Sequence, residues 1–134
     1  MLLPASLRYA LYIAWAVLLA TGIAWLATDA AAIRGLALKV HGAATMAVLA
    51  LAGAAVALHT LRAWQEGKNR TSGYGIAALV VALAASGWGL YYLGDDSARS
   101  LTSTAHWIVG LASPLVFAAH AWLGRRARRL AARG

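Results

Sequence analysis

The stretch TSTAHWIVGLASPLVFAAHAWLG, residues Thr102–Gly124, decides the fold of this chain. It is apolar for most of its length and carries two histidines, His106 and His120, fourteen residues apart. A helix turns by about 100° per residue, so fourteen steps end roughly 40° short of four full turns. Both imidazoles therefore lie on one face of a helix, about 21 Å apart along its axis.

A second apolar segment repeats this arrangement. Residues Val40–Leu61 carry His41 and His59, eighteen residues apart, which is about five whole turns and again one helix face. The chain has four histidines, and all of them lie in these two segments. Ionisable side chains inside apolar segments of this length are functional by default, because burying them in hydrocarbon is unfavourable.

The composition indicates a membrane protein. The 134 residues are 62% hydrophobic and 12% charged, whereas a soluble domain carries about 25% charged residues. The mean hydropathy is +0.67, and four apolar runs have the roughly 20 residues needed to cross a bilayer. These predicted spans are Tyr9–Thr28, Val40–Leu61, Tyr74–Leu93 and Thr104–Leu123. We predict an all-α, four-transmembrane-helix bundle that forms a single domain over residues 1–134, with no room for a soluble catalytic domain.

The net charge of +8 is distributed unevenly around these spans. Nine basic residues fall on one side of the membrane, and they are Arg8, Arg62, Lys68, Arg70, Arg125, Arg126, Arg128, Arg129 and Arg133. Three fall on the other side, and they are Arg34, Lys39 and Arg99. Short cytoplasmic loops concentrate Lys and Arg, so both termini are expected in the cytoplasm. The basic tail is then a topology signal that also contacts anionic lipid, and we expect no nucleic-acid partner.

An internal repeat relates the two halves of the chain. At an offset of 65 residues a small-residue pair, a loop arginine and the first histidine of each half align. The aligned positions are Thr21-Gly22 with Ser86-Gly87, Arg34 with Arg99, and His41 with His106. The second histidines, His59 and His120, differ from this offset by four residues, about one helical turn. A repeat of this kind predicts two tandem helical hairpins. Gly94-Asp95-Asp96-Ser97 is the expected turn of the second hairpin, and Ser103 or Thr104 the expected N-cap of its last helix.

The histidines form two candidate pairs at matching depth. The second and fourth spans run in the same direction, so His41 can face His106 near the periplasmic side and His59 can face His120 near the cytoplasmic side. A neutral imidazole is a good axial ligand for haem iron, and facing helices of a bundle hold such a cofactor in the core. The chain has no cysteine, which excludes iron–sulfur clusters and covalent c-type haem. The sequence therefore predicts two non-covalent haems b stacked across the membrane.

Other residues are candidates around these cofactors. Gly22 and Gly87 are expected near the outer haem, where a missing side chain admits a porphyrin edge; close helix packing explains them equally well. The haem propionates need cationic partners. The candidates are Arg34, Lys39 and Arg99 for the outer haem, and Arg62, Arg125 and Arg126 for the inner one. Topology and lipid contact explain these arginines too. No residue is a candidate catalytic group, and whether the chain is part of an enzyme stays open.

Three alternatives remain on the residues alone. The histidines can hydrogen-bond between helices, or the chain can be a haem-free anchor or assembly subunit. It can also be a metal or proton transporter, since histidine binds Zn²⁺ and relays protons. The acidic residues Asp29, Glu66, Asp95 and Asp96 all lie at span ends or in loops, which disfavours a transport path.

Two histidines on each of two parallel helices in a four-helix membrane protein resemble the bacterial di-haem b-type cytochromes. These include the cytochrome b561-like proteins and the cytochrome b subunits of membrane hydrogenases and formate dehydrogenases. The arrangement is also similar to the cytochrome b of quinol–cytochrome c reductases, where both helices keep about the same histidine spacing; here the spacings are eighteen and fourteen. The resemblance implies electron transfer in a bacterial inner membrane. It also implies a quinone and a periplasmic redox protein, or a larger respiratory complex, as partners.

Overall fold

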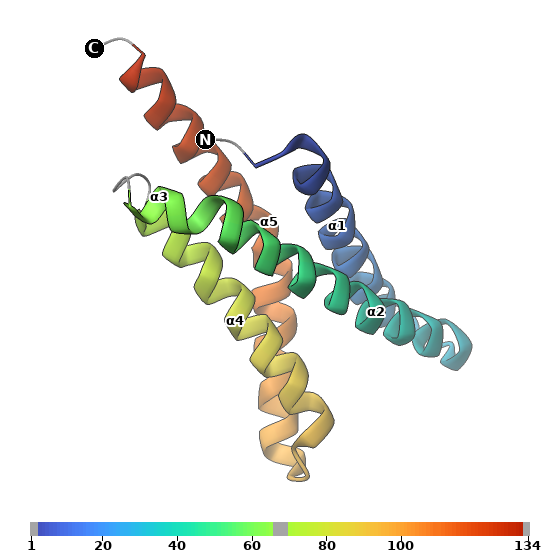
Figure 1. Cartoon of the computed structure of the whole chain (residues 1–134). Coiled ribbons are helices and arrows are strands. Elements are labelled where there is room, and N and C mark those ends of the chain that lie inside the picture. The colour runs from blue at the N-terminus through green and yellow to red at the C-terminus, as the bar shows by residue number, and fades with distance from the viewer. Residues whose placement is uncertain (1–2, 66–69, 133–134) are drawn as a thin grey trace. The chain divides into compact units, whose positions relative to one another are not determined.

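The structure is a computed structural model that describes residues 3–65 and 70–132 (Figure 1). Every element in these ranges is a helix, and four helices are long and apolar enough to span a membrane. The elements in chain order are α1 Ala5–Ala27, α2 Ala31–Ala55, the π-helix η1 Val56–Thr60, α3 Leu61–Gln65, α4 Arg70–Tyr92 and α5 Asp96–Ala131. The prediction of an all-α protein with four membrane-length helices is confirmed.

The chain divides into two compact units, Met1–Glu66 and Gly67–Gly134. In the first unit α1 packs against α2, and in the second α4 packs against α5. Each unit is a helical hairpin, as Figure 1 shows, with a connection of only three residues between its two long helices. The two tandem hairpins predicted from the 65-residue repeat are thereby confirmed. The association of the hairpins in a single four-helix domain stays a prediction.

The second helix of each hairpin begins earlier than predicted. α2 starts at Ala31 rather than Val40, and α5 starts at Asp96 rather than Thr104. Hydropathy marks only the part of a helix that lies in hydrocarbon, whereas the helix itself continues through the polar interface. α5 likewise continues through the terminal arginines to Ala131. Its 36 residues extend about 54 Å, well beyond a ~30 Å hydrocarbon core.

The expected N-cap of the last helix is therefore wrong. Asp95 caps α5, because its carboxylate accepts a hydrogen bond of 2.7 Å from the backbone N–H of Ala98. Thr104 lies inside the helix, where its hydroxyl donates to the carbonyl of Ser100. Asp96 and Ser97, expected in the turn, are the first residues of α5.

α2 continues into a π-helical turn near the second histidine. The backbone N–H of Leu61 donates to the carbonyl of Val56, five residues back, so this turn contains one extra residue. His59 lies within it. An extra residue sets the rotation of the helix back by up to about 100°. The side chain of His59 is therefore turned away from the direction that an unbroken α-helix would give it.

The histidine-bearing helices bury equivalent positions. Val48 of α2 and Ser113 of α5 are 3% and 1% exposed, and they are separated by the 65-residue offset of the repeat. Each lies seven residues after the first histidine of its helix, about two turns, and so on the same face as that histidine. The face that carries the first histidine therefore also carries a buried residue in each of the two helices.

Candidate functional site

The first histidine of each hairpin contacts a hydroxyl on the preceding helix. In the first hairpin His41 Nδ1 lies 2.9 Å from Thr21 Oγ1, and in the second His106 Nδ1 lies 2.8 Å from Ser86 Oγ. Both histidines stand ten residues after the first residue of their helix. The repeat therefore preserves a complete hydroxyl–imidazole pair, and not only the spacing of residue types.

The hydroxyls identify the tautomer of these two imidazoles. Thr21 Oγ1 also lies 2.7 Å from the carbonyl of Val17, and Ser86 Oγ lies 2.6 Å from the carbonyl of Ala82. A hydroxyl has a single hydrogen, which is donated to the carbonyl of its own helix. The same oxygen must then accept from the imidazole, so Nδ1 carries the hydrogen and Nε2 carries the lone pair. Metal-ligating histidines are commonly oriented in this way by a hydrogen bond from the other ring nitrogen.

A third pair occurs at the other end of the second hairpin. His120 Nδ1 lies 3.1 Å from Ser72 Oγ of α4. Fourteen residues separate Ser72 from Ser86, and fourteen separate His106 from His120. Because α4 and α5 are antiparallel, these equal spacings place Ser72 next to His120 just as Ser86 lies next to His106. The second hairpin thus has two hydroxyl–imidazole pairs on one helix–helix contact, about 21 Å apart along the axis.

His59 differs from the other three histidines. It follows His41 by eighteen residues, and in an antiparallel hairpin its counterpart lies eighteen residues before Thr21. That position is Leu3, which has no hydroxyl and precedes the start of α1 at Ala5. His59 also lies in the π-helical turn. The four-residue mismatch noted in the sequence therefore corresponds to a different local environment for this histidine.

The two candidate glycines lie against the histidine rings. A Cβ atom at Gly22 would lie 3.7 Å from His41 Cε1, and one at Gly87 would lie 3.4 Å from His106 Cε1. An added Cβ would be in van der Waals contact with the ring at either position. Each glycine directly follows the hydroxyl residue, so Thr21-Gly22 and Ser86-Gly87 together position an imidazole. Contact of these glycines with a porphyrin edge stays a prediction.

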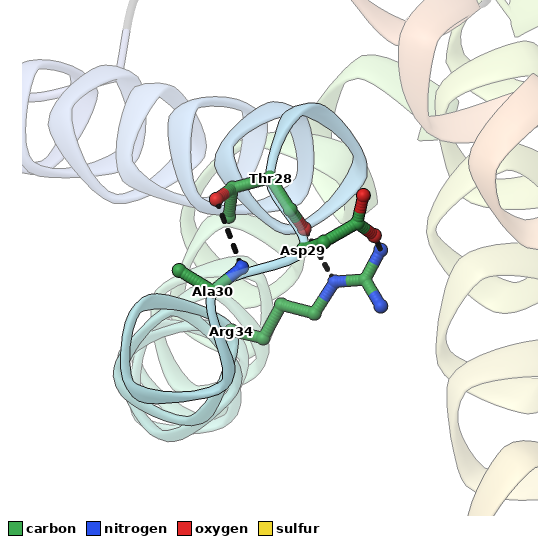
Figure 2. A network of polar contacts seen from close by, with 4 residues as sticks. All are labelled: Thr28, Asp29, Ala30 and Arg34. Atoms are coloured by element: carbon green, nitrogen blue, oxygen red, sulfur yellow. Dashed lines mark hydrogen bonds and ion pairs between the residues drawn. The ribbon is translucent and has the colours of Figure 1, made fainter.

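Arg34 holds the turn of the first hairpin, as Figure 2 shows. Its Nε donates to the carbonyl of Thr28 at 2.5 Å, and its Nη2 forms a 2.9 Å ion pair with Asp29. The Thr28 hydroxyl accepts a hydrogen bond of 3.2 Å from the backbone N–H of Ala30. The Arg34 guanidinium also lies 5.2 Å from the ring centroid of Trp25. These contacts give Arg34 a structural role besides the predicted one toward a propionate.

Arg99, the repeat equivalent of Arg34, has different surroundings. Gly94 stands where the first hairpin has Asp29, so the corresponding ion pair cannot form. The next residue, Asp95, accepts the N-terminal hydrogen bond of α5 instead. Of the two equivalent arginines, Arg99 is therefore the stronger candidate for a propionate.

Two other candidate propionate partners add little. Lys39 is exposed on α2, and the side chain of Arg62 is outside the described part of the structure.

The donor set fits a haem better than a bare metal ion. Among the described residues, no three His, Cys, Asp or Glu side chains come close enough to share an ion, and a structural or catalytic zinc site takes three or four such ligands. A haem requires only axial ligands from the protein. Single imidazoles with a fixed Nε2 lone pair meet that requirement.

The chain matches no protein-family model, no curated protein and no solved structure. The resemblance to di-haem cytochromes therefore depends on the histidines and their setting in the hairpins.

Removing the Ser86 hydroxyl should alter the tautomer of His106. In Ser86→Ala, Nδ1–H loses the hydroxyl that accepts its hydrogen bond, an interaction typically worth about 0.5–1.5 kcal/mol. In protein produced without haem, ¹⁵N NMR should then show His106 shifting toward the Nε2–H form. Ser86→Thr should preserve the wild-type spectrum, because threonine serves in the first hairpin. Thr104→Ala, which removes a hydroxyl bonded within α5, is the control; an unchanged tautomer in Ser86→Ala would contradict the assignment.

Proposed function

We propose that this protein is a transmembrane electron-transfer cytochrome that holds two haems b, each bound by two histidines. His41 and His106 hold the outer haem, and His59 and His120 hold the inner one. The observation that carries the proposal is the set of hydroxyl–imidazole contacts at His41, His106 and His120. The contacts at His41 and His106 leave Nε2 as the nitrogen that would bind iron in those two rings.

The residues around the histidines prepare them for this role. Hydrogen bonding at Nδ1 fixes the ring plane and raises the basicity of Nε2. Gly22 and Gly87 let the His41 and His106 rings lie close to the neighbouring helix. A bound haem supplies reversible one-electron transfer, and the chain contributes ligands, orientation and an apolar environment.

The pairing follows from the repeat. His41 and His106 occupy the same position in the two hairpins, and each contacts a hydroxyl twenty residues earlier in the chain. The proposal therefore assigns these two rings to equal depth in the membrane. With two imidazoles on each iron, no coordination position is left for substrate, so electrons alone pass through the protein.

The partners follow from the resemblance and the apolar surface. A lipid bilayer surrounds the four membrane-length helices. We place the protein in a bacterial inner membrane, where it passes electrons between the quinone pool and a redox protein, or larger respiratory complex, on the periplasmic side.

A histidine-based transporter is the second candidate, and it has weaker support. Proton and metal relays through membranes combine histidine with carboxylates, and the described residues bring no such cluster together. A haem-free anchor would leave the repeated hydroxyl–imidazole pairs without a purpose beyond helix packing.

The visible spectrum and haem content test the proposal. The purified protein should carry two haems per chain, extractable into acidified acetone because no cysteine tethers them. The reduced form should give the sharp α-bands of low-spin, six-coordinate b-type haem. Met46→Leu is the control, because Met46 lies five residues from His41, about 140° around the helix, and should not be a ligand. Fully loaded protein with no haem or one haem per chain would refute the two-pair assignment.

A further inference from the structure

The end of α5 carries a basic pocket built on one aromatic residue. Trp122, Arg125, Arg126 and Arg129 line a pocket of about 270 Å³. The arginines follow Trp122 by three, four and seven residues, which places all four side chains on one helix face. The Arg126 guanidinium lies 5.5 Å from the Trp122 ring centroid, so the indole holds this cation by stacking.

This pocket faces away from His120. Arg125 and Arg126 follow His120 by five and six residues, about 140° and 240° around the helix. Trp122 and Arg129 fall between them, near 200° and 180°. The His120 side of α5 packs against α4 through the Ser72 contact, so the pocket opens on the opposite, outer side of the hairpin. That orientation makes Arg125 and Arg126 poor partners for an inner-haem propionate.

The depth of the pocket matches the lipid phosphates. The apolar run ends near Leu123, and Arg125 and Arg126 lie about 3–5 Å further along the axis, with Arg129 at about 9 Å. The headgroup layer extends about 5–7 Å beyond the hydrocarbon on each side. Trp122 stands at the boundary, where indole side chains are enriched.

The charge of the pocket is not neutralised by carboxylates of the same part of α5. After Asp96 the sequence contains no Asp or Glu, so α5 offers the arginines no carboxylate. Guanidinium groups bind phosphate oxygens in a planar, bidentate manner that an ammonium group cannot reproduce. Each basic side chain near an anionic membrane surface contributes about 1 kcal/mol of attraction.

We propose that this pocket is a binding site for the headgroup phosphate of an acidic glycerophospholipid. The lipid phosphate lies among the arginines, and its acyl chains continue along the apolar face of α5 below Trp122. The inference goes beyond electron transfer and does not depend on the haems. An RNA backbone fits less well, because the pocket borders the hydrocarbon layer rather than a water-exposed domain.

Native mass spectrometry of the full chain in micelles tests the site, with phosphatidylglycerol and phosphatidylcholine as the probes. We expect about a tenfold preference for one bound phosphatidylglycerol. The triple variant Arg125→Gln, Arg126→Gln, Arg129→Gln should abolish the preference. The triple Arg→Lys variant keeps the charge but loses the planar donors and the stacking, so it should retain only about a third of the affinity or less.

The matched control removes three other basic residues of the same predicted side by Arg8→Gln, Lys68→Gln and Arg70→Gln. It should keep the wild-type preference. Equal loss in the control, or wild-type affinity in the Arg→Lys variant, would show a general charge effect and overturn the site. Competition by a short RNA but not by phosphatidylglycerol would overturn it too.

Discussion

His106→Ala should remove one of two haem spectral components and leave the other intact, and His41→Ala should remove the same component. The haem content should fall from two to about one per chain in each case. Both histidines have an Nδ1–H held by a hydroxyl of the neighbouring helix, and both stand at the same position in their hairpins. Loss of either ligand leaves the other alone on the iron.

His59→Ala and His120→Ala should each remove the second haem spectral component and leave the first intact. Because the smaller residue leaves an apolar space behind, some haem can stay in a five-coordinate, high-spin state, so spin state must be measured beside haem content. His120 has the Ser72 hydroxyl as a partner, whereas His59 lies in a π-helical turn with Leu3 as its register counterpart. We therefore expect the second component to be the less stable one.

Leu115→Ala is the matched control on α5, because this side chain is 74% exposed and lies nine residues from His106. It should preserve both components. If His41→Ala and His59→Ala instead removed one common haem, the ligands would have to pair along a single helix. Eighteen residues of helix separate them by about 27 Å, which no single iron can bridge, and the cofactor proposal would fail.

The sequence predicted the hairpins because their causes are local. Four apolar runs, separated by polar residues, require four helices, and the 65-residue offset requires the helices to be arranged twice in the same way. The Thr21-Gly22 and Ser86-Gly87 pairs were recognised as part of the repeat, but their contact with the imidazoles was not. That contact depends on the rotation of one helix against another, which hydropathy does not encode.

Ser72 was missed although the sequence contains a signal for it. Its fourteen-residue spacing from Ser86 equals the spacing of His106 and His120, and an antiparallel hairpin brings such positions together.

The starts of α2 and α5 were misplaced for another reason. Polar residues such as Arg34 and Lys39 ended the apolar run without ending the helix, because backbone hydrogen bonding continues through the interface. The surroundings of Arg34 and Arg99 differ because Asp29 and Trp25 of the first hairpin correspond to Gly94 and Leu90 of the second.

A further prediction concerns the orientation of the chain in the membrane. An alkaline phosphatase fused after Gly134 should be inactive, because this enzyme folds only outside the cytoplasm. The same enzyme inserted after Gly94 should be active, with at least about a tenfold difference between the two. We expect both termini in the cytoplasm because nine basic residues on one side stand against three on the other. The insertion point lies between α4 and α5, before Asp95, so that the N-cap of α5 is preserved.

A cytoplasm-active fluorescent reporter at the same two points should give the opposite result and serves as the control for expression. The Arg125→Gln, Arg126→Gln, Arg129→Gln variant is informative here as well. It leaves six basic residues against three, an excess that still favours the same orientation, so the reporter activities should be unchanged. Activity of the phosphatase after Gly134 would reverse the membrane orientation. It would then assign the His41–His106 pair to the cytoplasmic side, while the ligand pairing, which depends on the repeat and not on the charges, would stand.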